Sequence, residues 1–107
     1  MAGLEITPED WARMRAEPAR PRLIDVREGW ETALARLPEA EWLPMGEIYN
    51  WSGTLDKAGR YVLICHLGER SAMACQFLRS LGFRDVQNFA GGIDAWSRRV
   101  DGSVPRY

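Results

Sequence analysis

Cysteine and histidine are both scarce in this chain of 107 residues. The two cysteines, Cys65 and Cys75, lie ten positions apart, and two are too few for a disulfide framework. His66 is the only histidine, so a zinc site of the Cys/His type lacks ligands and a Ser-His-Asp triad is poorly supplied. These absences predict no metal site and leave the cysteines as the candidate chemical groups.

The chain also lacks a large net charge and a long apolar run. The chain has 14 basic and 15 acidic residues, a net charge of −1, which implies no strong attraction to nucleic acid or to an anionic membrane. The longest apolar run, residues 61–65, is far shorter than the roughly 18 residues that a spanning helix needs. No basic and apolar leader with a cleavage site opens the chain. We expect a cytoplasmic protein without nucleic-acid or membrane partners, and the sequence leaves its oligomeric state open.

The order of predicted elements indicates one α/β domain, residues 1–107, since this length fits a single core. The segment 61–89 has the order strand, loop, helix, strand, which is typical of a parallel sheet. Thr7 and Pro8 are typical of the start of a helix at residue 8. Gly82 is suited to end the helix predicted at 71–81. Strands are predicted at 4–6, 23–26, 42–43, 61–65 and 83–89, and helices from 8 and at 30–37, 45–51, 71–81 and 92–96.

Cys65 stands where the central strand of such a sheet ends, and ligands bind beyond the carboxyl ends of parallel strands. The following residues, 66–71, contain no proline, so each offers a backbone N–H, and Gly68 permits the positive φ of a tight curl. A helix N-terminus and the cation of Arg70 add positive charge and favour a thiolate. This anion-binding loop suits either a terminal persulfide sulfur or a phosphate-like anion, and both chemistries stay open here.

Other residues have a structural and a chemical interpretation. Free cysteines are usually buried and inert, which we expect for Cys75, although it could also act as a resolving thiol. We expect the His66 ring to point to solvent and only its N–H to serve the loop. Asp25 and Arg27, at the end of a neighbouring strand, either support the loop or form a structural salt bridge.

Three blocks resemble the rhodanese family of sulfurtransferases. They are residues 23–31, the loop from Cys65 to Ser71, and residues 91–96, which begin with two glycines and end in tryptophan. The resemblance implies a three-layer α/β/α fold with a five-stranded parallel sheet, and a catalytic Cys65 that cycles through a transient persulfide without any other cofactor. It also implies that the loop residues bind the sulfur: His66, Leu67, Gly68, Glu69, Arg70 and Ser71. The chain departs from the usual pattern at Arg36 and Glu39, where the family commonly has a histidine and a glycine.

The length of the loop distinguishes a resemblance to the sulfurtransferases from a resemblance to the related phosphatases. Arg70 is five positions after Cys65, as in sulfurtransferases, whereas the related phosphatases carry one more residue. The resemblance thus implies transfer of a sulfane sulfur from thiosulfate, polysulfide or a protein persulfide to a thiol or cyanide. A sulfur-carrier or interaction module without turnover, and a cysteine-dependent phosphatase, are the alternatives. Glu69 either pairs with Arg70 or repels a dianionic donor, so we expect weak use of thiosulfate.

Overall fold

The computed structural model describes residues 3–107 and forms a sheet of five parallel strands. The strands lie in the order β1-β5-β4-β2-β3, so the strand that carries the candidate cysteine is central. Their bounds are Glu5–Ile6 (β1), Arg22–Asp25 (β2), Glu41–Trp42 (β3), Arg60–Ile64 (β4) and Asp85–Phe89 (β5). The expected five-stranded parallel sheet is confirmed.

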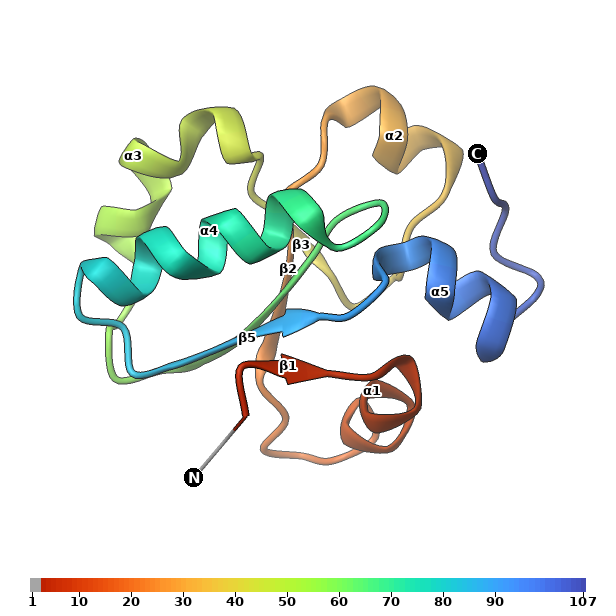
Figure 1. Cartoon of the computed structure of the whole chain (residues 1–107), viewed down its shortest axis with the longest axis horizontal. Helices are drawn as coiled ribbons and strands as arrows, with labels where there is room; N and C mark the ends of the chain where they lie inside the picture. The colour runs from red at the N-terminus through yellow and green to blue at the C-terminus, as the bar shows by residue number, and fades with distance from the viewer. Residues whose placement is uncertain (1–2) are drawn as a thin grey trace.

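Helices cover both faces of the sheet and give three layers (Figure 1). The helices α3 and α4 lie over one face, α1 and α5 lie over the other, and α2 lies near the end of β2. Two short 3-10 turns flank α3. The bounds are Pro8–Met14 (α1), Gly29–Leu34 (α2), Ile48–Trp51 (α3), Glu69–Ser80 (α4) and Gly92–Arg99 (α5), with 3-10 turns at Met45–Glu47 and Ser52–Thr54.

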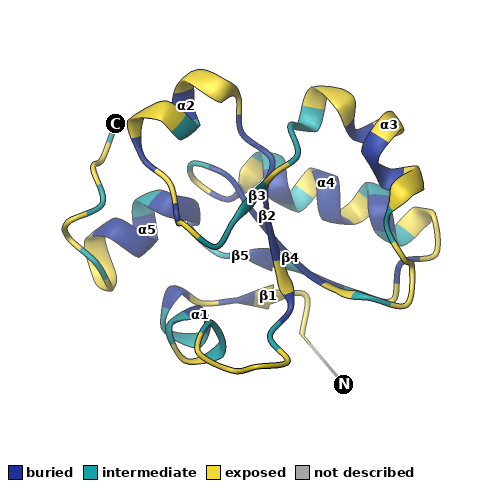
Figure 2. Cartoon of the chain, turned by 180° about the vertical axis from the view of Figure 1, so that it is seen from behind, coloured by how far each residue is buried: buried dark blue, intermediate teal, exposed yellow. Residues whose placement is uncertain are grey.

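The central strand β4 is buried on both sides, as its uninterrupted apolar sequence predicts. Alternate side chains enter different cores: Tyr61 and Leu63 pack with the α3 and α4 side, whereas Val62 and Ile64 pack with the α1 and α5 side. Figure 2 shows this buried centre between more exposed helices. Cys65, directly after β4, continues the first set and is itself buried. The cysteine thus directly follows a strand that is packed on both faces.

Several helix boundaries differ from the sequence prediction: α3 begins at Ile48 after a 3-10 turn and not at residue 45, and α5 continues to Arg99 and not only to Trp96. Two further differences lie next to the site. The helix α4 begins at Glu69 and not at Ser71, because Gly68 adopts a left-handed conformation (φ 103°) and takes the capping position. The helix α2 ends at Leu34 and not at residue 37, because Ala35 is extended (φ −161°) and is buried in the core. Arg27 also donates a 2.6 Å hydrogen bond to the Ala35 carbonyl. Both differences have a tertiary cause that local helix propensity does not contain.

The predicted start of α1 is confirmed in detail. Thr7 and Asp10 form a reciprocal capping box, and Pro8 takes the first turn. Glu39, one of the departures from the family pattern, accepts hydrogen bonds from Trp11 (2.9 Å) and Arg15 (2.8 Å) and so ties α1 to the segment after α2.

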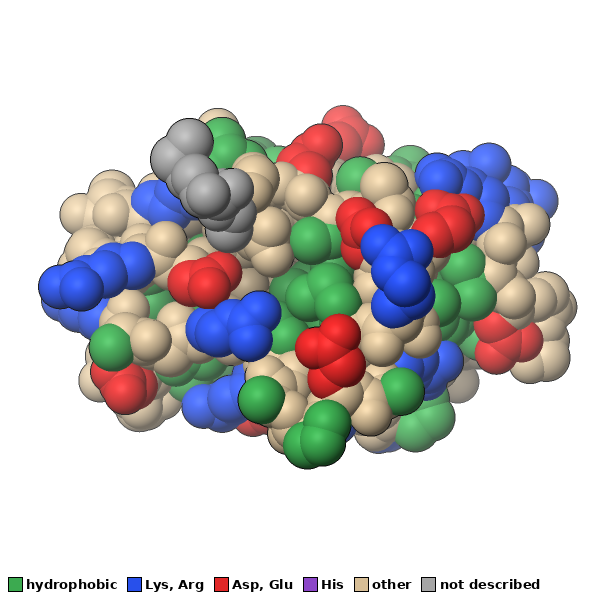
Figure 3. Space-filling view, turned by 90° about the horizontal axis from the view of Figure 1, so that it is seen from below, with side chains coloured by type: hydrophobic (Ala, Val, Ile, Leu, Met, Phe, Trp, Pro, Cys, Tyr) green, Lys and Arg blue, Asp and Glu red, His purple; other side chains and the backbone are tan. Residues whose placement is uncertain are grey.

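Charges of both signs are interspersed with apolar side chains on the face that Figure 3 shows, without a broad field of one sign. This agrees with the net charge of −1. Among residues 3–107, none of the helices combines the length and the apolar character needed to cross a bilayer.

Candidate active site

The sulfur of Cys65 lies at the end of β4 and at the N-terminus of α4. It accepts hydrogen bonds from the backbone N–H of Gly68 (3.1 Å) and of Ser71 (3.4 Å). Ser71 is the third residue of α4, so its N–H has no carbonyl partner within the helix. The sulfur therefore occupies the position of a helix cap, where exposed N–H groups and the helix dipole stabilise negative charge. The arrangement suits an anionic sulfur.

The hydroxyl of Ser71 links the sulfur to a polar group on β5. Its oxygen lies 3.2 Å from the Cys65 sulfur and 2.5 Å from Oδ1 of Asn88. The hydroxyl is within donor distance of both atoms, and its single proton can go either to Asn88 or to the sulfur. The amide nitrogen of Asn88 donates to the Gly68 carbonyl (3.0 Å) and to Glu5 (3.1 Å), which fixes its orientation. Asn88 thus holds the Ser71 hydroxyl beside the Cys65 sulfur.

The N-terminus of α5 determines which backbone groups of the loop face the sulfur. The N–H of Ile93 donates to the Cys65 carbonyl (2.9 Å), and that of Asp94 donates to the His66 carbonyl (3.1 Å). Gly92 makes this approach possible, because a Cβ there would lie 2.3 Å from the His66 carbonyl oxygen and its φ is 63°. Both carbonyls are therefore engaged by α5, away from the sulfur.

Arg70 forms its ion pair with Glu31 of α2 and not with Glu69. The two side chains make a bidentate pair with both N–O distances at 2.7 Å, and the Glu31 side chain is only 3% exposed. Glu31 also accepts from the N–H of Glu28 (3.0 Å). Hydrogen bonding to Arg70 lowers the pKa of Glu31 to about 2, and the same contact raises the pKa of Arg70. The positive charge beside the loop is therefore neutralised by a permanent carboxylate.

Asp25 and Arg27 form a fully buried salt bridge behind this pair. Arg27 donates to both carboxylate oxygens of Asp25, at 2.7 Å from its Nη2, and has no exposed side-chain surface. Arg27 also donates to the hydroxyl of Tyr107 (2.9 Å), which in turn donates to Glu31 (2.8 Å). The pair is a buried salt bridge, and through Tyr107 it is connected to Glu31, the partner of Arg70. That it supports the loop stays a prediction.

The prediction for the His66 ring is wrong. The ring does not point to solvent but stacks on Tyr107, with centroids 3.9 Å apart and planes 12° from parallel. Its Nε2 atom is buried and has no hydrogen-bond partner among the described residues. The reason is that residues 100–107 return to the carboxyl end of the sheet and supply an aromatic surface. Nothing in the local sequence around His66 indicates this neighbour.

A cavity of about 340 Å³ opens beside the sulfur. Leu67 and Met73, which line it, are 52% and 60% exposed, and Glu69 is also exposed. The carboxylate of Glu69 is therefore free of the Arg70 pair and lies at the mouth of the site. The lining residues are Cys65, His66, Leu67, Glu69, Arg70 and Met73. The structure thus brings together four of the predicted loop side chains around the thiol.

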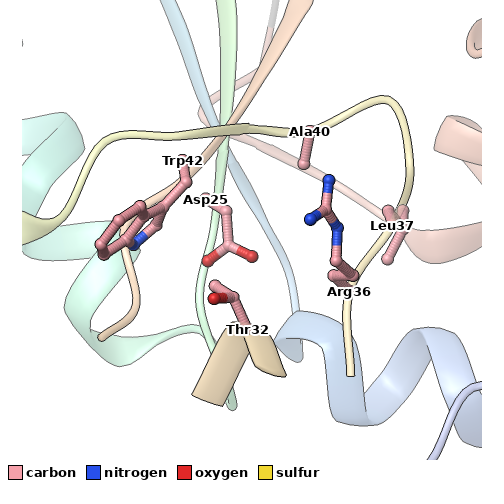
Figure 4. A pocket seen from close by; sticks show the side chains of 6 residues that line it. All are labelled: Asp25, Thr32, Arg36, Leu37, Ala40 and Trp42. Atoms are coloured by element: carbon pink, nitrogen blue, oxygen red, sulfur yellow. The ribbon is translucent and has the colours of Figure 1, made fainter. Parts of the chain in front are cut away.

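A second, smaller cavity of about 110 Å³ lies beside Asp25, at the ends of β2 and β3. Figure 4 shows the Asp25 carboxylate and the side chains of Thr32, Arg36 and Trp42 around it. The Asp25 oxygens are already held by Arg27, so this cavity is separate from the thiol chemistry. Within residues 3–107, no group of three or more His, Cys, Asp or Glu side chains could hold a metal ion.

Cys75 is confirmed as a core residue. It is 1% exposed, and burial raises the pKa of its thiol to about 12.

Three site residues were missed by sequence reasoning. Glu31 is part of a block that resembles the family, but its pairing with Arg70 joins residues 39 positions apart. Asn88 is a polar residue inside a buried strand, a signal that could have drawn attention to it. Tyr107 has no comparable signal, because its partners His66, Glu31 and Arg27 all lie far away in the sequence.

Comparisons with known proteins show the family of the chain. The model of the rhodanese-like domain family matches residues 7–99. The putative sulfurtransferase YtwF of Bacillus subtilis is 46% identical over 74 residues, which are 69% of this chain and 71% of that protein. A protein of Allochromatium vinosum named sulfurtransferase is 35% identical over 94 residues, 88% of each. The crystal structure of SSP1007 from Staphylococcus saprophyticus superimposes with a TM-score of 0.83 at 28% identity, over 97% of this chain and 100% of that one.

Some relatives are much longer than this chain. It spans 30% of the Arabidopsis thaliana chloroplast protein named rhodanese-like/PpiC domain-containing protein 12, at 37% identity over 80% of this chain. It spans 43% of the putative sulfur carrier protein YrkF of Bacillus subtilis, at 32% identity over 74% of this chain. The family model covers most of the chain, and two relatives that the chain matches over more than two thirds of their length are 46% and 35% identical over the aligned residues, so this protein belongs to the rhodanese-like domain family.

Proposed function

We propose that this protein is a sulfurtransferase that carries a sulfane sulfur as a persulfide on Cys65. The observation that carries the proposal is the position of the Cys65 sulfur, which accepts N–H bonds from Gly68 and Ser71 at the N-terminus of α4. Relatives named sulfurtransferase support it. The cavity beside the sulfur is the place for the transferred atom and for its donor.

The reaction has two steps. The Cys65 thiolate attacks the outer sulfur of the donor, an S–S bond forms, and the donor leaves with the electron pair of its broken bond, as sulfite when the donor is thiosulfate. An acceptor thiolate or cyanide then attacks the terminal sulfur of Cys65–S–S⁻, and the Cys65 thiolate leaves. Sulfite and thiolate are adequate leaving groups, so neither step requires a general acid.

The donor is proposed to be a polysulfide or a protein persulfide in preference to thiosulfate. Arg70 is neutralised by Glu31, and the carboxylate of Glu69 lies exposed at the mouth. A dianion approaching this mouth meets a paired cation and an exposed carboxylate. The exposed apolar side chains of Leu67 and Met73 offer contact area to a protein donor or acceptor.

A sulfur-carrier role without small-molecule turnover is the second candidate, and the relative named as a sulfur carrier favours it. It uses the same persulfide on Cys65 but has only protein partners. The phosphatase alternative is less well supported, because the loop from Cys65 to Arg70 is one residue shorter than in those enzymes.

The test is the mass of the intact protein after incubation with thiosulfate or polysulfide. One added sulfur gives an increase of about 32 Da, expected in the wild type and in Cys75→Ala but absent in Cys65→Ser. Loss of that mass on adding cyanide or a thiol, with repeated turnover, indicates an enzyme; loss only to a protein acceptor indicates a carrier. A failure to gain sulfur, together with Cys65-dependent hydrolysis of p-nitrophenyl phosphate, would overturn the proposal.

A further inference from the structure

Residues 100–107 pack against α5 and contribute Tyr107 to the site. After α5 it turns back, and in Figures 1 and 2 its end lies beside α2. Ser97 donates a 2.5 Å hydrogen bond to the Val104 carbonyl, and Arg106 pairs with Asp94 at 2.9 Å. These contacts along α5 carry Tyr107 to the carboxyl end of the sheet, next to the loop that follows Cys65.

The hydroxyl of Tyr107 connects two ion pairs. It accepts from Arg27 (2.9 Å) and donates to Oε1 of Glu31 (2.8 Å). Arg27 is immobilised by its buried pair with Asp25, so the position of the hydroxyl is well defined. Burial raises the pKa of Tyr107 to about 12, and the hydroxyl therefore keeps its proton at neutral pH. The same Oε1 atom of Glu31 accepts from Arg70. Tyr107 thus helps to hold the carboxylate that binds Arg70.

The ring of Tyr107 contacts His66, which lines the cavity beside the sulfur. It stacks on His66 at 3.9 Å, and Trp30 packs edge-on against it with centroids 6.0 Å apart. This stacking leaves Nε2 of His66 buried without a partner among residues 3–107, an arrangement that is unfavourable by itself. The aromatic contacts must offset it. His66, a lining residue of the cavity, is therefore placed by Tyr107.

We propose that Tyr107 is a positioning residue that sets the donor specificity of the sulfur-transfer site. The inference rests on the proposed function. Tyr107 holds Glu31 on Arg70, and this keeps the guanidinium engaged when an anionic donor arrives. Without the hydroxyl, Glu31 loses one of the four hydrogen bonds to its carboxylate, and Arg70 is released more readily to a dianion. The KM for thiosulfate should therefore fall, whereas the KM for a donor with one negative charge less should fall by a smaller factor.

The kinetic test compares thiosulfate with benzenethiosulfonate, which offers the same outer sulfur on a monoanion. Attack by the Cys65 thiolate releases sulfite from the first and benzenesulfinate from the second, and both leave Cys65–S–S⁻. For Tyr107→Phe we expect the KM for thiosulfate to fall about three-fold, with kcat unchanged and a smaller change for benzenethiosulfonate. This is less than the full strength of one hydrogen bond to a charged group, because the other three bonds to the Glu31 carboxylate remain. Tyr49→Phe is the matched control, since Tyr49 is 81% exposed on α3. An unchanged ratio of the two KM values would overturn the inference.

A second readout is independent of activity. His66 is the only histidine, so its ring protons give single, assignable NMR signals. The Tyr107 ring should shift them upfield in the wild type and in Tyr107→Phe, and the shift should vanish in Tyr107→Leu. Signals that are the same in all three proteins would contradict the placement of His66 by Tyr107. A wild type that takes sulfur from neither donor would overturn the proposed function, whereas normal loading with an unchanged donor ratio would overturn only the role of Tyr107.

Discussion

Replacing Gly92 by alanine should separate the loop after Cys65 from α5 and destabilise the fold. The new Cβ would lie 2.3 Å from the carbonyl oxygen of His66 and 2.6 Å from that of Cys65. Both atoms belong to the backbone, so relief requires movement of the loop or of the helix. Such a movement lengthens the hydrogen bonds from Ile93 (2.9 Å) and Asp94 (3.1 Å) to these carbonyls.

The size of the effect follows from three contributions. Alanine at the φ of 63° that Gly92 adopts costs about 1–2 kcal/mol. Weakening two backbone hydrogen bonds costs about 1–3 kcal/mol in total. Alanine also lowers the conformational entropy of the unfolded chain, which stabilises the fold by less than about 1 kcal/mol. We expect the free energy of unfolding to fall by about 2–4 kcal/mol, a large part of the roughly 5–15 kcal/mol that is usual for a domain.

The assay is urea unfolding followed by tryptophan fluorescence. With an m-value of about 1.5 kcal/mol/M, the midpoint should fall by about 1.3–2.7 M. Gly102→Ala is the matched control, because a Cβ at Gly102 would meet nothing within 4 Å and this glycine does not have a positive φ. At low urea, where Gly92→Ala is folded, its Cys65 should also gain sulfur more slowly. A midpoint within about 0.3 M of the wild type would refute the close contact between α5 and the loop.

Three further predictions concern charge and the second thiol. The pKa of Glu31 is lowered to about 2 from 4.5, so its ionised form stabilises the fold above about pH 4.5, and this contribution of about 3 kcal/mol is lost as the pH falls toward 2. Urea unfolding between pH 7 and pH 3 should show a smaller acid loss in Glu31→Gln than in the wild type; equal losses would contradict the ion pair. In Cys65→Ser, the buried Cys75 should resist iodoacetamide at pH 8 and react fully in urea, as measured by intact mass; rapid native alkylation would show that it is accessible. Glu69→Gln should raise kcat/KM for thiosulfate by about two- to five-fold, as expected for one exposed charge acting on a dianion; no rise would count against repulsion by Glu69.

The position of the thiol could be predicted because it depends on local signals. The consecutive apolar residues of β4 specify a strand covered on both faces, and Cys65 follows directly where such a strand ends. Gly68 marks the curl, and its positive φ is found. The strand was placed within one residue, since β4 ends at Ile64 and not at Cys65, and the start of α4 was misplaced by two. Glu69 and Arg70 are both acceptable in a helix, and the sequence alone does not say whether the capping residue comes before or after them.

The surroundings of the thiol could not be predicted, because they come from segments that only the tertiary fold brings together. Arg70 had a carboxylate next to it in the sequence, Glu69, yet it pairs with Glu31 from a different helix. Neighbouring residues on a helix point in different directions, so adjacency in sequence does not imply a contact between side chains. The stacking of His66 on Tyr107 has the same origin. A long-range partner of this kind leaves no periodicity or spacing to detect.

The distribution of charge around Cys65 bears on the donor in the proposed sulfur transfer. Arg27 and Arg70 are both held in ion pairs, so in the proposed reaction an anionic sulfur on Cys65 would be stabilised by the N–H groups of Gly68 and Ser71 and by the dipole of α4. Such dipoles act at short range: they stabilise a sulfur atom that is already bound but do little to attract a dianion from solution. Affinity for the donor must then come from contacts outside the loop. A donor that brings its own contact surface, such as a protein persulfide, meets this requirement better than thiosulfate does.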